Sequence, residues 1–99
     1  MHALRQGAGP PLVLVHGALG DCRQWAPIAA ALAERFEVWS LSRRHHWPAP
    51  PPSPEVLYTV DSQADDLIAF LASLNRPATV VGHSYGTAVA LVAATRAPE

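Results

Sequence analysis

The sequence predicts an α/β fold, in which a parallel sheet is flanked by helices. Strand and helix patterns alternate along the 99 residues, and this order favours parallel strands joined by right-handed crossovers. Residues 11–17 read P-L-V-L-V-H-G, a continuous apolar run typical of a strand that is buried on both faces. Between Thr79 and Val92 a β-branched run meets a glycine-rich turn, and a helical pattern follows at once.

The first half of the chain is expected to form two further strands and a helix. His2 to Arg5 is predicted to end a short strand, and residues 7–11 turn into the buried strand. Asp21 is a suitable N-cap, so a helix is predicted from Cys22 to Arg35, where apolar residues repeat at spacings of three and four. Glu37 to Leu41, E-V-W-S-L, follows as a strand.

The second half begins with a loop. Ser42 to Pro54 is too dense in proline for a helix or a strand ladder. Val60 to Leu74 has apolar residues on one face and aspartates near its start, which is the favourable end of a helix for acids. Residues 75–77, Asn-Arg-Pro, are expected to stop this helix before the last strand begins.

The turn after that strand carries the strongest functional signal. It reads Gly82, His83, Ser84, Tyr85, Gly86, and a serine at the apex of a strand–turn–helix is the arrangement called a nucleophile elbow. The sharp reversal strains the apex residue, often into a positive φ. Side chains two positions before and after would collide with neighbouring elements, so glycine is favoured at both. An ordinary Gly/Ser turn is the alternative, and the predicted strand and helix on either side favour the elbow.

The buried strand ending in His16-Gly17 and the G-x-S-x-G turn together resemble the alpha/beta-hydrolase family. In that family, the loop after His-Gly supplies one backbone amide of the oxyanion hole, and the residue after the nucleophile supplies the other. The resemblance therefore implies the following site residues: Ser84 as the nucleophile, and the amides of Tyr85 and Ala18 as oxyanion donors, with Leu19 as the alternative to Ala18.

The resemblance covers essentially the whole chain, but the chain covers only about the first third of such a fold. Residues 1–99 are thus expected to be an incomplete alpha/beta-hydrolase domain, without the lid and the C-terminal part of the triad. In this fold the triad runs serine, acid, histidine. Downstream of Ser84 the acidic residue is Glu99 and no histidine follows, so acid and histidine are expected from residues beyond this sequence.

Several residues near the motifs are expected to be structural. The set is His16, Gly17, Gly82, His83 and Gly86. The ring of His16 is expected to hold neighbouring loops. The side chain of His83 is expected to point away from that of Ser84, because the two are adjacent on an extended segment.

The proline-rich loop departs from the family pattern. Where the family commonly has Asp-x-Arg-Gly-x-Gly, residues 41–46 read L-S-R-R-H-H, which resembles a serine-hydrolase subgroup with Ser-Leu-Arg-His at this point. His45 and His46 are expected to form a loop or pocket-rim pair, since a metal site needs three or four converging ligands. Trp25 and Trp47 are expected to pack in the core or to line an acyl pocket.

Composition excludes several classes. A net charge of −1 with 15% charged residues favours neither nucleic acid nor an anionic membrane surface as a partner. No lysine is present for a P-loop, and G-x-G-x-x-G is absent; no cofactor and no metal are predicted. Cys22 is the single cysteine, so no internal disulfide forms. With no signal-peptide core and no run approaching ~20 apolar residues, a cytoplasmic location is expected.

The function predicted from these observations is that of a serine hydrolase. It would act on a small-molecule ester or related acyl compound through an acyl-enzyme, and be complete only with residues beyond this chain. The alternatives are a truncated non-catalytic homologue or binding remnant, and a cofactor-free haloperoxidase or acyltransferase of the same fold. A serine at position 84 disfavours the dehalogenase and epoxide-hydrolase branches, which use a carboxylate. Self-association through the open edge of the elbow strand is also expected.

Overall fold

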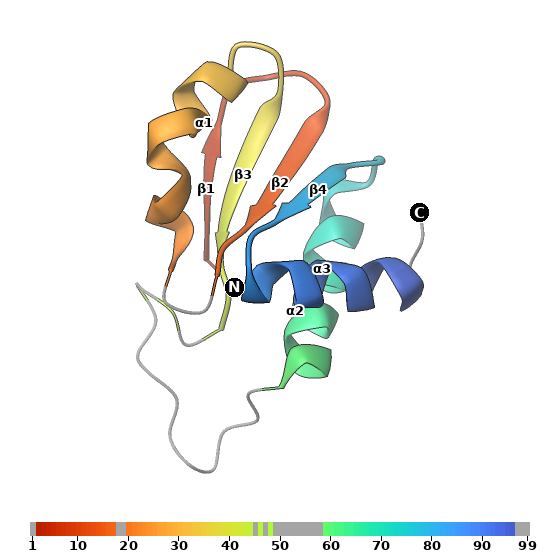
Figure 1. The fold of residues 1–99 in the computed structure, drawn as a ribbon. Coiled ribbons are helices and arrows are strands. Elements are labelled where there is room, and N and C mark those ends of the chain that lie inside the picture. Colours follow the sequence, from red (N-terminus) through yellow and green to blue (C-terminus); the bar gives the residue numbers. More distant parts are fainter. Residues whose placement is uncertain (1, 18–19, 45, 47, 49–58, 97–99) are drawn as a thin grey trace.

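The computed structural model describes residues 2–17, 20–44, 46, 48 and 59–96. Strands and helices alternate as the sequence predicts (Figure 1). In chain order they are β1 (His2–Gln6), β2 (Pro11–Val15), the 3₁₀ helix η1 (Cys22–Trp25), α1 (Ala26–Leu32), β3 (Glu37–Ser42), α2 (Val60–Leu74), β4 (Thr79–Gly82) and α3 (Tyr85–Arg96).

The sheet has four strands in the order β1-β3-β2-β4. Strand β2 pairs in parallel with β3 and β4, and Val13 lies opposite Trp39 on one side and Val80 on the other. The predicted parallel α/β sheet is therefore confirmed for these three strands. The short first strand pairs antiparallel with β3, which makes the whole sheet mixed.

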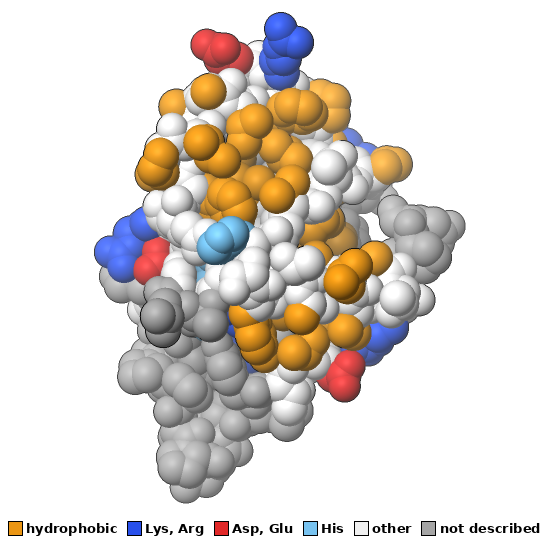
Figure 2. Space-filling model, viewed as in Figure 1, with side chains coloured by type: hydrophobic (Ala, Val, Ile, Leu, Met, Phe, Trp, Pro, Cys, Tyr) orange, Lys and Arg blue, Asp and Glu red, His pale blue; other side chains and the backbone are white. Residues whose placement is uncertain are grey.

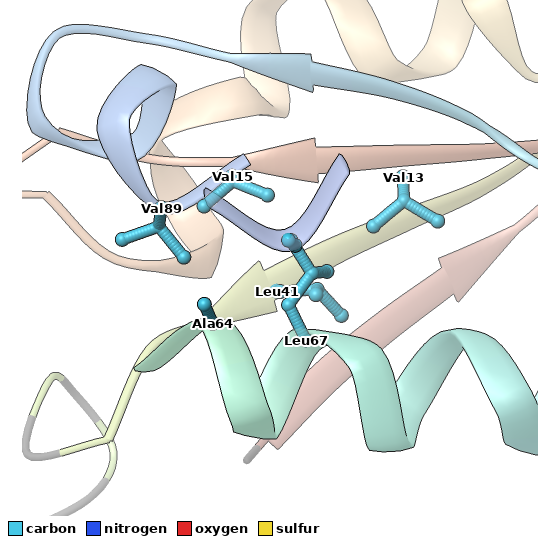
Figure 3. Packing of buried hydrophobic residues seen from close by; sticks show 7 residues of the cluster. Val13, Val15, Leu41, Ala64, Leu67 and Val89 are labelled. Atoms are coloured by element: carbon cyan, nitrogen blue, oxygen red, sulfur yellow. The ribbon is translucent and has the colours of Figure 1, made fainter. Parts of the chain in front are cut away.

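Strand β2 lies at the centre and all five of its residues are buried. Side chains alternate between the two faces of a strand, and the alternation assigns the helices to layers. Leu12 and Leu14 pack in one cluster with Trp25 and Ala29, on the side of η1 and α1. Val13 and Val15 face the other way, against α2 and α3 (Figure 3). The buried residues of that second cluster are Val13, Val15, Leu41, Ala64, Leu67, Val89 and Ala93.

The helix predicted from Cys22 to Arg35 is wrong in its bounds. Its first turn is the 3₁₀ helix η1, and the α-helix runs only from Ala26 to Leu32. Pro27 lies in the first turn of α1, where the missing N–H does no harm; further inside a longer helix the ring would clash with the preceding turn. The predicted cap is confirmed, since the Asp21 carboxylate accepts a 2.8 Å hydrogen bond from the Arg23 backbone N–H.

The bounds of α2 are those predicted. Thr59 and Ser62 form a capping box at its start, with hydrogen bonds of 3.0 and 3.1 Å, and Asn75 ends the helix at φ 55°. Among the residues described, no helix combines the length and the apolar character needed to cross a membrane. Most of the predicted proline-rich loop lies outside the described residues.

Strand β4, which leads into the turn that contains Ser84, is an edge strand of the described sheet. Within the described sheet it pairs with β2 alone, and Val81 is 39% exposed. Leu91, on α3, is 62% exposed. Figure 2 shows hydrophobic side chains gathered on this face of the molecule, over α1 and the neighbouring strands and again over α3.

Candidate active site

Ser84 stands at the hinge between β4 and α3. Its φ is 53°, the positive value expected at the apex of an elbow, and such a conformation is rare for a residue with a side chain. Ser84 is exposed, while Gly86 and Val89 in the helix behind it are buried. The hinge thus presents a serine hydroxyl at the surface, at the N-terminus of a 12-residue helix whose dipole favours negative charge there.

The glycines on either side of Ser84 are required by close packing. A Cβ on Gly82 would lie 2.7 Å from Thr87 Cα, and one on Gly86 would lie 2.4 Å from the carbonyl oxygens of Val15 and His16. These atoms belong to backbone, which cannot move aside as a flexible side chain could. The G-x-S-x-G spacing therefore follows from the approach of α3 to the end of β2.

The loop after β2 and the elbow lie against each other. The His83 backbone N–H donates a 3.0 Å hydrogen bond to Val15 O. A Cβ on Gly17 would be 3.3 Å from Ser84 Cβ and 3.2 Å from His83 Nδ1. Because β2 and β4 are parallel neighbours, their carboxyl ends open at the same edge of the sheet, and Gly17 borders Ser84 there.

Backbone amides at the start of α3 differ in their hydrogen bonds. Gly86 N–H donates to His83 O and Thr87 N–H donates to Ser84 O, both at 2.9 Å. The Tyr85 N–H makes no hydrogen bond to another residue in the described part of the chain. Donors that a helix start leaves unpaired are suited to a bound anion. The other two predicted donors, the amides of Ala18 and Leu19, lie outside the described residues.

His16 is fully buried and joins two loops through both ring nitrogens. The Arg43 backbone N–H donates to His16 Nε2 at 2.9 Å, and His16 Nδ1 lies 2.7 Å from Gly17 O. An amide N–H can only donate, so Nε2 accepts and the ring proton sits on Nδ1. Burial lowers the pKa of His16 from 6.5 to about 4, and the positive charge of Arg43 acts in the same direction. The ring is neutral near pH 7 and both of its nitrogens are occupied.

Arg43 is a site residue whose role the sequence did not reveal. Its guanidinium is buried behind the site, with Nη2 donating to Gly17 O at 2.8 Å and Nε donating to His16 O at 3.3 Å. Its Cζ lies 4.6 Å from the centre of the Tyr85 ring, within the range of a cation–π contact. Arg43 therefore fixes the Gly17 carbonyl and supports the first residue of α3.

Gln63 completes this buried cluster from α2. Its Oε1 accepts from Arg43 Nη1, and its Nε2 donates to Thr59 O at 3.0 Å and to the Tyr85 hydroxyl at 3.3 Å. Gln63 is 1% exposed. A polar residue on the inward face of a predicted amphipathic helix was the available signal, since buried polar groups require partners.

The remaining histidines occupy different surroundings. His83 is exposed, and its ring lies edge-on to buried Trp25 with 6.3 Å between centroids. His46 Nδ1 lies 2.8 Å from Gly20 O, and its ring is 4.5 Å from that of His16. His45 and Trp47 lie outside the described residues. Within the described ranges no group of three potential metal ligands occurs.

Comparison with known proteins identifies the family. A model described as the alpha/beta hydrolase family matches residues 12–98, so the chain belongs to the alpha/beta hydrolase family. Its relatives include the uncharacterized hydrolase YraK of Bacillus subtilis (strain 168), which is 34% identical over 100 residues spanning 100% of this chain and 37% of YraK.

Solved structures agree with this assignment. A marine microorganism esterase has a TM-score of 0.87 at 29% identity, with 98% of this chain and 37% of the esterase covered. An epoxide hydrolase from an endophytic Streptomyces has a TM-score of 0.86 at 29% identity, with 98% and 30% covered. The chain spans about a third of the length of the curated relatives that it matches, 37% and 35% for the first two.

Proposed function

We propose that this chain carries the nucleophile and the oxyanion site of a serine hydrolase that acts on an ester or related acyl compound. The observation that carries the proposal is the position of Ser84, exposed at φ 53° and bordered by Gly17, whose Cβ would be 3.3 Å from Ser84 Cβ. A serine in that position distinguishes acyl chemistry from the carboxylate-based branches of the family.

In the proposed reaction, Ser84 Oγ attacks the substrate carbonyl carbon and a base takes the hydroxyl proton. The carbonyl oxygen becomes an oxyanion, which the Tyr85 amide and the Ala18 or Leu19 amide would hold. Collapse of this intermediate expels the leaving group and forms an acyl-serine, which water then hydrolyses. Arg43, His16 and the Gly20 N–H all bond the Gly17 carbonyl, so Gly17, in the loop after β2, is held by three contacts.

The base and its orienting acid would come from residues outside this sequence. No histidine follows Ser84, and His16 is neutral with both ring nitrogens engaged. An oxyanion site and bound substrate alone retain roughly 10³-fold acceleration over water when triad members are removed. The chain by itself is therefore expected to show weak, site-specific reactivity without efficient turnover.

Chemical rescue tests this proposal. The chain is incubated with a fluorophosphonate at increasing imidazole concentration, so that imidazole replaces the missing base, and the adduct is located by mass spectrometry. We expect phosphonylation of Ser84 to rise with imidazole and to be absent in Ser84→Ala. Ser73, exposed on α2, is the control within the same chain. Equal labelling of Ser73 and Ser84, or no labelling at any imidazole concentration, would overturn the proposal.

A non-catalytic homologue is the second candidate, favoured by the buried His16, whose two ring nitrogens are both engaged and so do not serve Ser84 as a base. Such a protein would keep the elbow as a structural feature and would use the same region for binding. The two candidates differ in one outcome of the rescue experiment. Selective reaction at Ser84 supports the hydrolase, whereas an inert Ser84 in a folded chain supports the non-catalytic homologue.

A further inference from the structure

We infer that Gln24 is a positioning residue of the proposed site: its carboxamide joins the Gly17 loop to the elbow and holds the ring proton of His83 on Nε2. The inference deepens the proposed function at Ser84 and rests on it. The basis of the inference is that the Gln24 side chain bonds both the loop that contains Gly17 and the turn that contains Ser84, although Gln24 belongs to neither segment.

Gln24 reaches both loops from the 3₁₀ helix η1. Its Oε1 accepts a 3.2 Å hydrogen bond from the Gly17 backbone N–H, and its Nε2 lies 2.9 Å from His83 Nδ1. Gly17 and Ser84 approach each other between these two contacts. The carboxamide therefore spans the seam where the end of β2 meets the elbow.

The direction of each hydrogen bond is fixed by chemistry. A backbone N–H only donates, so the end of the carboxamide facing Gly17 is its oxygen. The other end is then the amino group, which also only donates. His83 Nδ1 must accept from it, and the proton of the neutral ring sits on Nε2. If His83 carried a proton on Nδ1, two donors would face each other, and reversing the carboxamide would only move the same conflict to Gly17.

The surroundings hold the Gln24 side chain in place. A Cβ on Gly20 would lie 2.1 Å from Gln24 Oε1, so the absence of a side chain at Gly20 makes room for the carboxamide. Helix η1 is itself anchored to the sheet, because the Cys22 backbone N–H donates to Ser42 Oγ at 2.8 Å. Next to Gln24, Trp25 is buried and borders the His83 ring. Gln24 and Trp25 together confine that ring.

Two substitutions distinguish the contact of Gln24 with Gly17 from its contact with His83. Gln24→Glu keeps an acceptor for Gly17 N–H and replaces the donor facing His83 by a second acceptor. Gln24→Leu keeps a similar size and removes both contacts. Gln6→Glu, at an exposed position on β1, adds the same charge far from the site and serves as the matched control.

Nuclear magnetic resonance of the ¹⁵N-labelled chain measures both contacts of the Gln24 carboxamide. Nitrogen shifts of His83 report which ring nitrogen carries the proton, and hydrogen exchange reports the Gly17 amide. We expect the proton on Nε2 in the unmodified chain and in Gln6→Glu, and on Nδ1 in Gln24→Glu. In Gln24→Leu the Gly17 amide should exchange roughly fivefold faster, the factor expected for one lost hydrogen bond, whereas in Gln24→Glu it should stay slow.

The inference would be overturned if His83 carried its proton on Nδ1 in the unmodified chain. It would also be overturned if the position of the ring proton were the same in all variants. The effect on reactivity is measured in the imidazole experiment, where Gln24→Leu should lower the rate of Ser84 phosphonylation roughly fivefold, by the same reasoning. An unchanged rate in Gln24→Leu would reject the positioning role even if the bridge exists. If no variant reacts, the proposed function fails, and the two spectroscopic readouts still decide whether Gln24 bridges the loops.

Discussion

The carboxyl end of strand β4 and its outer edge differ in the residues that surround them. At its carboxyl end, where Gly82 leads into the elbow, buried polar groups are joined in one cluster around Arg43, His16 and Gln63. Along the edge that is unpaired within the described sheet, large apolar residues are exposed, namely Val81 and, on the adjoining helix, Leu91. A groove of about 630 Å³ lies between α2, α3 and the start of β4. The polar end is completed by contacts within the chain, whereas the edge offers apolar surface for association.

The polar cluster and the apolar edge are therefore expected to affect different properties of the chain. The polar cluster specifies the arrangement of the loops, because a substitution that removes one member leaves a buried partner without its hydrogen bond. The apolar edge specifies nothing by itself, since apolar contact lacks direction. Substitutions at the carboxyl end are therefore expected to change folding stability, and substitutions at the edge to change association.

The largest effect is expected from Arg43→Met. The substitution removes the guanidinium that bonds Gly17 O, His16 O and Gln63 Oε1, and it leaves Gln63 Oε1 buried without that donor. Loss of one partner from such a buried charged network destabilises by about 3 kcal/mol. Denaturant unfolding followed by circular dichroism measures the change. Arg35→Met, at an exposed position, should stay within about 0.5 kcal/mol. Equal effects at the two arginines would show that the cluster does not organise this end of the sheet.

A smaller effect is expected from pH, through His16. Its pKa is lowered from 6.5 to about 4 by burial, so between these values the unfolded chain binds a proton that the folded chain does not. Stability is highest above pH 6.5 and falls as the pH drops toward 4, by at most about 1.4 kcal/mol per pH unit from this group. His16→Asn can still accept from Arg43 N–H and has no titrating ring. Unfolding measured from pH 7.5 to 4.5 (about neutral to mildly acidic) should show a shallower slope in this variant, and an identical slope would contradict the assignment.

Much of this architecture could be predicted because local patterns decide it. The buried run of β2, the capping of α2 and the glycine spacing of the elbow depend on nearby residues, and the sequence displays them directly. The end of α1 could not be placed, because the apolar repeat continues beyond Leu32 while the chain already turns toward β3. Propensity gives no signal for such a tertiary constraint.

The polar cluster could not be predicted for a different reason. Arg43 follows β3, Gln63 lies on α2 and Gln24 lies on η1, and only the folded chain brings them to Gly17 and Tyr85. Their residue types are common on surfaces, so composition and periodicity do not distinguish them. The approach of the Ser84 turn to the loop after β2 followed from motifs, but the side chains that hold the two together required coordinates.

The smallest effect on folding stability is expected at the outer edge of β4. A substitution there also tests whether the apolar edge, unlike the polar cluster, promotes association. Val81→Lys places a charge on the exposed edge strand, a common means of blocking edge-to-edge pairing, and should change folding stability by less than about 0.5 kcal/mol. We expect the chain to self-associate through β4, and this variant to weaken that association by roughly tenfold, about 1.4 kcal/mol. Leu4→Lys, on the opposite edge strand β1 and 45% exposed, is the matched control. Sedimentation velocity over a range of concentrations measures both. A chain that stays monomeric throughout, or an equal response to the two lysines, would show that the apolar surface beside β4 has no special part in association.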